Sequence, residues 1–540
     1  MVPARIFGFT LLAWLAAILL FAPIAALIVE AISQPSPSFR HLWDTVLWDY
    51  IENSLILVVG VCLMAVIWGL PSAWLTTRYE FPGRRFFRWA LLLPMAMPAY
   101  VVAYIYTDLF DYSGIVQNTI RDLFGFQSAQ DYWFFDIRTM GGAIFVLSLV
   151  FSPYVYWITS LNFNAQCQSL VHASRLLGAN EYKTFFRVVL PLSRPALAVA
   201  CSLVAMETLA DFGTVSYFSV WNVTTAIYDT WLSLSDLSAA AKLACLLLLF
   251  VVILIALEKT SRRRSRYHNQ HTMPLIRQQL QGKSRYLATA WCSLVVFWGF
   301  LLPMIMVINY AVMYLFDTKW AEFYKMLYYS LLLATTVAVS AVLIALIVLT
   351  AQRFGQRKLT AIPRQISSLG YAVPGTVLAI GVLIVTSGAD HRINEFFNAI
   401  GISSRGLIFS GTLIAMGYAF LSRFAAIGIG SVDSGLVKIP YSLDQTAQLC
   451  GHRPLSTVKK VLLPLLRNSL LTAFLLVFLE SLKELSAAIL LRPFNVETLA
   501  TYVYQYMSAE EFEVAALPAL VIVLAGLPPV IILTASMNRK

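Results

Sequence analysis

Four carboxylates in strongly apolar surroundings are the residues of this sequence best suited to chemistry. They form two pairs with the same internal spacing, Glu207 with Asp211 and Glu480 with Glu484. Side chains one helical turn apart lie on one face of a helix. Carboxylate oxygens are ligands that hard cations prefer. The pairs therefore predict transient contact with a cation, and no firm metal site.

A structural role for the same carboxylates is the alternative, with ion pairs to Lys483 or Arg492 or bonds to nearby hydroxyls. Counted along a helix from Pro191, Glu207 lies about 24 Å away and Asp211 about 30 Å away. The same count from Pro464 applies to the second pair. Ionisable groups in a membrane normally face a bundle interior or a wet cavity. We expect both pairs near the outer boundary of a pathway, with Thr225 and Thr498 in the same vestibule.

The elements that position these residues are predicted to be membrane-spanning helices. Hydrophobic residues make up 59% of the chain and charged residues 12%, and the mean hydropathy is +0.72. Many apolar runs have about twenty residues, the length that crosses a bilayer as a helix. The fold class is therefore an all-α polytopic membrane protein. Twelve spans are predicted, at 6–29, 54–76, 89–109, 140–162, 191–216, 237–257, 286–310, 329–351, 366–387, 406–428, 465–490 and 516–536.

Lys and Arg residues between these spans fall mostly on one side. The opposite side holds Arg40, Arg121, Arg138, Lys319, Lys325, Arg392, Arg405 and Arg492. The positive-inside rule then places both termini in the cytoplasm. The net charge of +11 follows from this topology and does not indicate nucleic-acid binding. The basic segment 258–285 is predicted to be a solvated linker, with binding to anionic membrane lipid as its alternative.

The two halves of the chain repeat one another. We predict a first repeat at 1–257, a linker at 258–285 and a second repeat at 286–540. Pro98 matches Pro374, the segment 53–55 matches 329–331, and 222–225 matches 495–498. Because six spans separate the copies, the repeats have the same orientation in the membrane and are parallel.

Each repeat also contains a polar cytoplasmic segment, at 165–194 and 438–467. Gly178 and Pro191 have the same separation as Gly451 and Pro464. We expect a short helix broken at the glycine and then a second helix that stops at the proline, where the next span begins. Small residues upstream leave a surface that a soluble partner could approach closely. These are Ala173, Ser174, Thr446 and Ala447.

These segments resemble the Glu-Ala-Ala (EAA) loop of ABC-importer permeases. The triplets read His172-Ala173-Ser174 and Gln445-Thr446-Ala447, so the usual glutamate is absent from both copies, while the glycines and the Leu-Pro endings match. In that family the loop seats in a groove of the ATP-hydrolysing subunit. The resemblance therefore implies a coupling role for His172, Ala173, Ser174, Gly178, Pro191, Gln445, Thr446, Ala447, Gly451 and Pro464.

Segments 206–231 and 479–520 are similar to the fused, double-length permeases of bacterial ferric-iron importers. This resemblance implies the MetI-like permease fold, two copies of an ABC ATPase subunit at the cytoplasmic face, a periplasmic solute-binding protein, and the bacterial inner membrane. No GxxxxGK[ST] phosphate loop occurs in the sequence. We therefore expect a transport subunit that is not an enzyme and needs no cofactor.

Two alternatives stay open at this stage. The same architecture could import thiamine, a phosphonate or a polyamine. In a different class, a stand-alone secondary transporter can also have six plus six spans, although it has no need of two docking segments.

Overall fold

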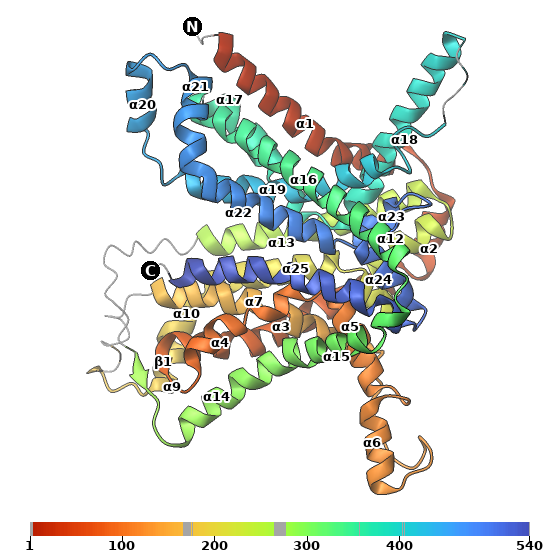
Figure 1. Ribbon diagram of the computed structural model, residues 1–540, viewed down its shortest axis with the longest axis vertical. Helices are drawn as coiled ribbons and strands as arrows, with labels where there is room; N and C mark the ends of the chain where they lie inside the picture. Colours follow the sequence, from red (N-terminus) through yellow and green to blue (C-terminus); the bar gives the residue numbers. More distant parts are fainter. Residues whose placement is uncertain are drawn as a thin grey trace. The chain divides into compact units, whose positions relative to one another are not determined.

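The computed structural model describes residues 4–165, 174, 176–263, 277–355, 357–401, 403 and 406–538. His172, Ala173 and linker residues 264–276 lie outside this described part. Nearly all regular structure is helical (Figure 1). The described strands are β1 (Tyr79–Glu80) and β2 (Gln278–Gln279), which pair in parallel. The chain divides into two compact units.

Unit 1 consists of Met1–Thr45, Ala226–Leu248 and Thr318–Gln505. The helices that lie within it are α1 (Ala4–Ser33), α2 (Pro37–Thr45), α16 (Trp320–Phe354), α17 (Arg357–Ser367), η5 (Gly370–Ala372), α18 (Gly375–Ala399), α19 (Leu413–Leu436), α20 (Ser442–Leu449), α21 (Pro454–Thr457), η6 (Val458–Leu462), α22 (Leu463–Lys483) and α23 (Ser486–Leu491). Three more helices cross the unit boundaries, namely α12 (Val223–Leu232), α13 (Leu237–Arg263) and α24 (Leu499–Ser508).

Unit 2 consists of Val46–Thr225, Leu249–Asp317 and Tyr506–Lys540. Besides the two strands it contains α3 (Leu47–Arg78), α4 (Arg84–Ala90), η1 (Leu93–Ala96), α5 (Ala99–Phe110), α6 (Ile115–Phe124), α7 (Met140–Ala165), α9 (Glu181–Thr184), η2 (Phe185–Val189), α10 (Leu190–Ala210), α11 (Gly213–Tyr217), α14 (Lys283–Val296), η3 (Phe297–Leu301), α15 (Leu302–Met313), η4 (Leu315–Asp317) and α25 (Phe512–Asn538).

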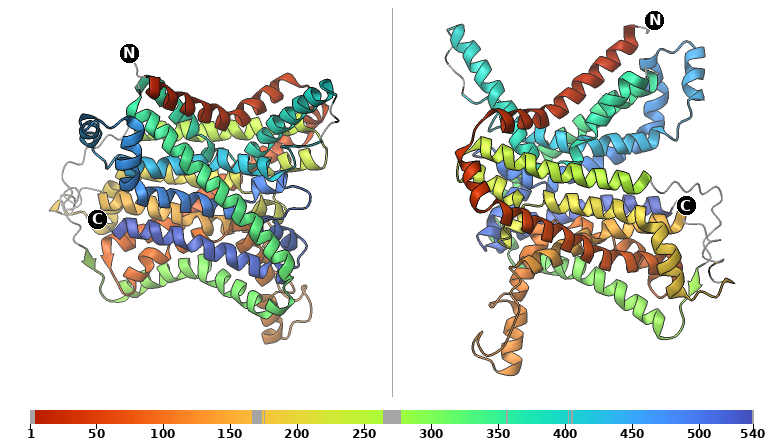
Figure 2. Two further views of the ribbon diagram at one scale, coloured as in Figure 1. Left: turned by 45° about the horizontal axis from the view of Figure 1, so that its top comes forward. Right: turned by 180° about the vertical axis from the view of Figure 1, so that it is seen from behind.

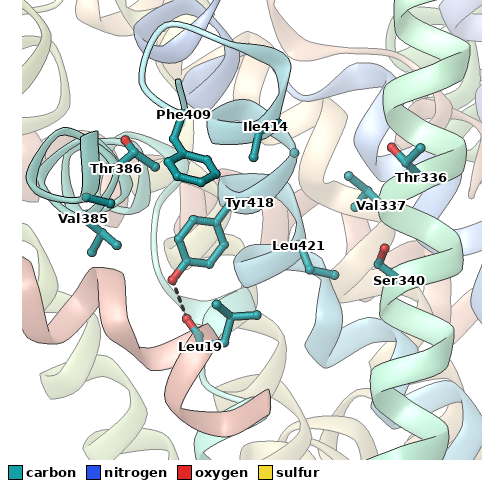
Figure 3. A pocket seen from close by; sticks show the side chains of 12 residues that line it. Leu19, Thr336, Val337, Ser340, Val385, Thr386, Phe409, Ile414, Tyr418 and Leu421 are labelled. Atoms are coloured by element: carbon teal, nitrogen blue, oxygen red, sulfur yellow. Dashed lines mark hydrogen bonds between the residues drawn. The ribbon is translucent and has the colours of Figure 1, made fainter. Parts of the chain in front are cut away.

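The compact units do not follow the two sequence halves, because the first helix of each half packs in the unit of the other half. In unit 1, Ala13, Ala16 and Leu20 form a buried stripe on α1 that packs against α16 and α19. Tyr418 of α19 also donates a 2.5 Å hydrogen bond to the carbonyl of Leu19, beside a mainly apolar cavity of about 420 Å³ (Figure 3).

The same exchange occurs in unit 2. The indole ring of Trp291 on α14 stacks on that of Trp68 on α3, with 5.9 Å between the ring centroids. The Tyr106 hydroxyl of α5 donates a hydrogen bond to the carbonyl of Trp298. Figure 2 shows α1 alongside the helices of unit 1 and α14 alongside those of unit 2. The division into repeats at the linker thus remains a prediction about the sequence. In the packed structure, the first helix of each half belongs to the unit formed mainly by the other half.

Among the described residues, ten helices are long and apolar enough to cross a membrane, and an eleventh is added if one bent pair counts as a span. That pair, Arg84–Ala96 and Ala99–Phe124, is bent by 93°. The continuous span predicted at 89–109 is therefore wrong. A residue before proline avoids helical backbone, and Met97 before Pro98 is extended with ψ 129°. The predicted twelfth span, 516–536, lies on α25, where Phe512–Pro528 is a shorter apolar helix.

Candidate functional site

Two long helices, one in each unit, connect the predicted docking segments with the carboxylate pairs. We call Glu181–Ala210 (α9, η2, α10) the first lever helix and Pro454–Lys483 (α21, η6, α22) the second lever helix. Each has 30 residues without a break, or about 45 Å at the rise of an α-helix. The expectation that a separate helix stops at Pro191 or Pro464 is therefore wrong.

A π-helical turn lets each lever helix pass through its proline. The turns are η2 (Phe185–Val189) and η6 (Val458–Leu462), at equivalent positions directly before Leu-Pro. Inside an α-helix, a proline ring collides with the carbonyl of residue i−4 and leaves it without a donor. A π turn shifts the bonding by one residue, as Leu190 N–H bonds to the Phe185 carbonyl, and a widened turn relieves that collision. One continuous helix thus runs from each predicted docking segment toward its carboxylate pair.

The glycine before each lever helix closes a Schellman motif. In the second copy, His452 N–H donates to the Ala447 carbonyl at 2.9 Å and Gly451 N–H donates to that of Gln448 at 2.9 Å. In the first copy, Ala179 N–H donates to the Ser174 carbonyl at 3.0 Å. The motif needs a left-handed residue, and Gly178 and Gly451 have φ of +82° and +79°. The shared spacing thus places Ser174 and Ala447 in the last turn of a helix.

Exposed leucines beside these glycines were missed in the sequence. Leu176 is 89% exposed and Leu449, at the equivalent position of the second copy, is 88% exposed. Leu177 is similarly exposed. All three lie outside the helices that qualify as membrane spans, so contact with the lipid core does not account for their exposure. A leucine two residues before the glycine, in an otherwise polar segment, was the signal. Gln445 and Thr446 lie on α20 beside Ala447, and both are exposed.

The two docking segments are anchored differently. In the second copy, Arg353 at the end of α16 forms a 2.5 Å ion pair with Asp444 of α20, and both side chains are buried. Arg353 also donates to the carbonyls of Leu436 and Ile439 at 3.1 Å. In the first copy, the Tyr79 hydroxyl donates to Glu181 at 2.8 Å, and Ser174 and Thr184 hydroxyls lie 3.0 Å apart.

At the other end of each lever helix, the second carboxylate of the pair caps the short helix that follows. Asp211 Oδ1 accepts from the N–H groups of Thr214 and Val215 at the start of α11, at 2.9 and 3.3 Å. Glu484 Oε1 accepts from Ala487 N–H at the start of α23, at 3.1 Å. The helices end at Ala210 and Lys483, so the predicted i, i+4 helix face ends just before Asp211 and Glu484.

The charges of the second pair are neutralised within unit 1. Glu484 forms a 2.5 Å ion pair with Arg423 of α19, and the two side chains are 7% and 8% exposed. Glu480 pairs with Lys483 at 2.9 Å, where both side chains are a quarter exposed. Arg423 lies inside α19, and the predicted span 406–428 contains it. Arg492 pairs with Glu497, on the loop after α23.

In unit 2 the first pair has a different environment. Asp211 and Glu207 interact electrostatically, and Glu207 is half-buried with further contacts. Among the described residues, no three His, Cys, Asp or Glu side chains are grouped to hold a metal ion. Transient cation contact by these carboxylates stays a prediction.

Thr225 and Thr498 are buried and lie in helix caps. The Asn222 N–H bonds to Thr225 Oγ1 at 3.0 Å, and Thr498 N–H bonds to Thr501 Oγ1 at 2.9 Å. The vestibule role of both threonines stays a prediction.

The repeat alignment in this segment needs a correction. Ser54 accepts from the N–H of Val223, and Ser330 accepts from that of Leu499. Thr225 therefore corresponds to Thr501 and not to Thr498. The loop 492–498 is longer than the loop 218–222. The alignment of 222–225 with 495–498 by sequence similarity therefore had the wrong register.

Comparisons with known proteins agree with this architecture. A family model for the inner membrane component of binding-protein-dependent transport systems matches residues 65–267 and 344–539. An Fe(3+)-transport system permease protein of Haemophilus influenzae is 24% identical over 89% of this chain and 88% of its own length. A ferric transport system permease protein of Actinobacillus pleuropneumoniae is 26% identical over 89% of this chain and 70% of its own.

Single-repeat relatives match less of the chain. The molybdenum transport system permease protein of Escherichia coli is 27% identical over 41% of this chain and 97% of its own length. Both copies of the family model cover a lever helix, its docking glycine and its carboxylates. The chain belongs to the family of binding-protein-dependent transport system inner membrane components.

Proposed function

We propose that this chain is the membrane subunit of an ATP-driven importer for ferric iron. The observation that carries the proposal is the pair of lever helices, each continuous from a docking segment with bare leucines to a pair of carboxylates. A stand-alone transporter has no use for two such docking segments. The relatives that align along most of the chain are named as ferric permeases, which favours iron over thiamine, phosphonates or polyamines.

In the proposed arrangement, both termini and both docking segments face the cytoplasm, as the distribution of Lys and Arg indicates. One ATPase subunit binds at each docking segment, and a periplasmic binding protein delivers iron at the opposite face. The chain hydrolyses no ATP itself. The coupling residues are those of the predicted segments, together with Leu176 and Leu449. Glu207, Asp211, Glu480 and Glu484 lie at the outer end, where they would meet cargo briefly or shape the path.

The leucines give a direct test of docking. Replacing Leu176 and Leu449 together with aspartate should lower ATPase retention by roughly tenfold or more, because each buried leucine contributes about 1.5–3 kcal/mol to a contact. The measurement is the amount of ATPase that co-purifies with the chain from membranes. Iron uptake should fall in parallel.

The matched control replaces Leu123 and Leu407 with aspartate. These leucines are also well exposed, but they lie beyond the carboxylate ends of the proposed topology. The control should retain the ATPase. Full ATPase retention by the Leu176/Leu449 variant would contradict the docking role, as would an equal loss in the control.

A further inference from the structure

Unit 1 contains a second cavity, of about 780 Å³, between the beginning of α1 and the beginning of the second lever helix. Figure 1 shows both helices starting at the same end of this unit. The lining residues are Gly8, Phe9 and Leu12 of α1, together with Arg453, Pro454, Leu455, Ser456, Lys459 and Lys460. The two walls of the cavity have opposite chemical character.

One wall is cationic. Arg453, Lys459 and Lys460 are exposed, and none of the three has an ion-pair partner within the described ranges. Three uncompensated cations around one cavity attract an anion. They also lie at the start of a 30-residue helix, whose N-terminus adds a partial positive charge.

The other wall is apolar. Phe9 packs beside the buried stripe of α1, while Leu12 is about half exposed. Leu455, between the cations, is also half exposed. An inorganic phosphate would leave these apolar side chains bare. An amphiphile with an anionic head satisfies both walls.

The position of the cavity along the membrane-spanning helices fits this ligand. Gly8–Ser33 and Pro454–Lys483 both qualify as membrane spans, and the cavity lies where both begin. It is therefore at the level of a membrane surface. In the topology of the proposed function, on which this step rests, that surface is the cytoplasmic one, where a basic pocket between helices suits an anionic lipid head group.

We propose that this cavity binds one anionic phospholipid. Its phosphate lies among Arg453, Lys459 and Lys460, and its acyl chains lie along Phe9, Leu12 and Leu455. The lipid then connects α1 with the second lever helix, directly beside the docking segment. The first copy has Asn180 and Phe186 where the second has Arg453 and Lys459, so it does not repeat this set of three cations.

The test uses the purified full-length chain in nanodiscs and counts bound lipid by native mass spectrometry, with phosphatidylglycerol against phosphatidylcholine. The wild type should retain phosphatidylglycerol preferentially. The variant R453Q/K459Q/K460Q should lose roughly a hundredfold in affinity, since each basic residue contributes roughly fivefold. A matched control, K183Q/R187Q/R194Q, removes three exposed cations of the first lever helix and should bind as the wild type does.

A second variant, L12N/L455N, keeps the charges and should weaken long-chain phosphatidylglycerol more than a short-chain form. Retained preference in the triple variant overturns the proposal, and so does an equal loss in the control. Displacement of the lipid by millimolar inorganic phosphate would identify a phosphate site instead. Because neither iron nor ATPase is present in this assay, its failure leaves the proposed function standing.

Discussion

Replacement of Glu484 with glutamine should destabilise unit 1 by about 3–5 kcal/mol, because it leaves Arg423 buried without its charge partner. The pair is almost fully enclosed, with a 2.5 Å contact. Its surroundings cannot relax easily, since a Cβ on Gly375 would lie 2.5 Å from Glu484 Oε1 and 2.7 Å from the Arg423 guanidinium. The same substitution weakens the cap of α23.

The apparent melting temperature of the detergent-purified chain measures this effect, and a fall of roughly 6–10 °C is expected. Glu480→Gln is the control. Its pair with Lys483 is partly exposed, and such pairs contribute about 0–1 kcal/mol. A Glu484→Gln variant that melts with the wild type would show that the ion pair is not a structural element.

A double variant separates structure from transport. Arg423→Met together with Glu484→Met removes both charges, and apolar replacement of a buried pair is often neutral for stability. If stability returns and uptake stays low, the Glu484 charge belongs to the pathway. If stability and uptake both return to wild-type values, the ion pair has only the structural role of connecting α19 to the break between α22 and α23.

Replacement of Asp444 with asparagine should release the second docking segment while unit 1 stays folded. It leaves Arg353 buried without its anion, a loss of about 3–5 kcal/mol, and Arg353 also holds the carbonyls of Leu436 and Ile439. We expect faster amide hydrogen exchange in α20 and loss of ATPase retention. Hydrogen exchange read by mass spectrometry reports the first effect segment by segment.

Asp433→Asn serves as its control. Asp433 pairs with Arg364 at 2.7 Å, but both side chains are about a third exposed, so its loss should cost about 1 kcal/mol or less. Unchanged exchange in α20 of the Asp444→Asn variant would contradict the anchoring role of Arg353.

The sequence predicted the elements that depend on local composition. Apolar runs predicted most of the spans, with 89–109 and 516–536 as the exceptions. The repeated glycines predicted the turns before both lever helices, since a left-handed residue is required at that point of a Schellman motif. The family assignment followed from the same motifs and is confirmed by the two family matches.

Features that depend on distant contacts were not accessible. Proline usually ends a helix, so Pro191 and Pro464 were assigned to boundaries, and the π turns that carry the helix through them leave no clear signal in composition. The ion pair between Arg423 and Glu484 was not predicted, because the two residues are 61 positions apart in the chain. The exchange of α1 and α14 between units is a choice of packing partner, which hydrophobic periodicity does not specify.

The carboxylates show most clearly which features could not be predicted from the sequence. Their spacing identified both pairs, yet Asp211 and Glu484 lie just beyond the ends of their helices and cap the next ones. The structural alternative foresaw the partner of Glu480, Lys483. It did not foresee Arg423, because the first repeat has Val150 at that position and repetition gave no hint of it.

The cargo is measured as uptake of labelled ferric iron and labelled thiamine, in cells that lack this chain and in the same cells with the chain restored. We expect iron uptake to be lost and then restored, with thiamine uptake unchanged throughout. Unchanged iron uptake together with lost thiamine uptake would contradict the assignment of ferric iron as the cargo.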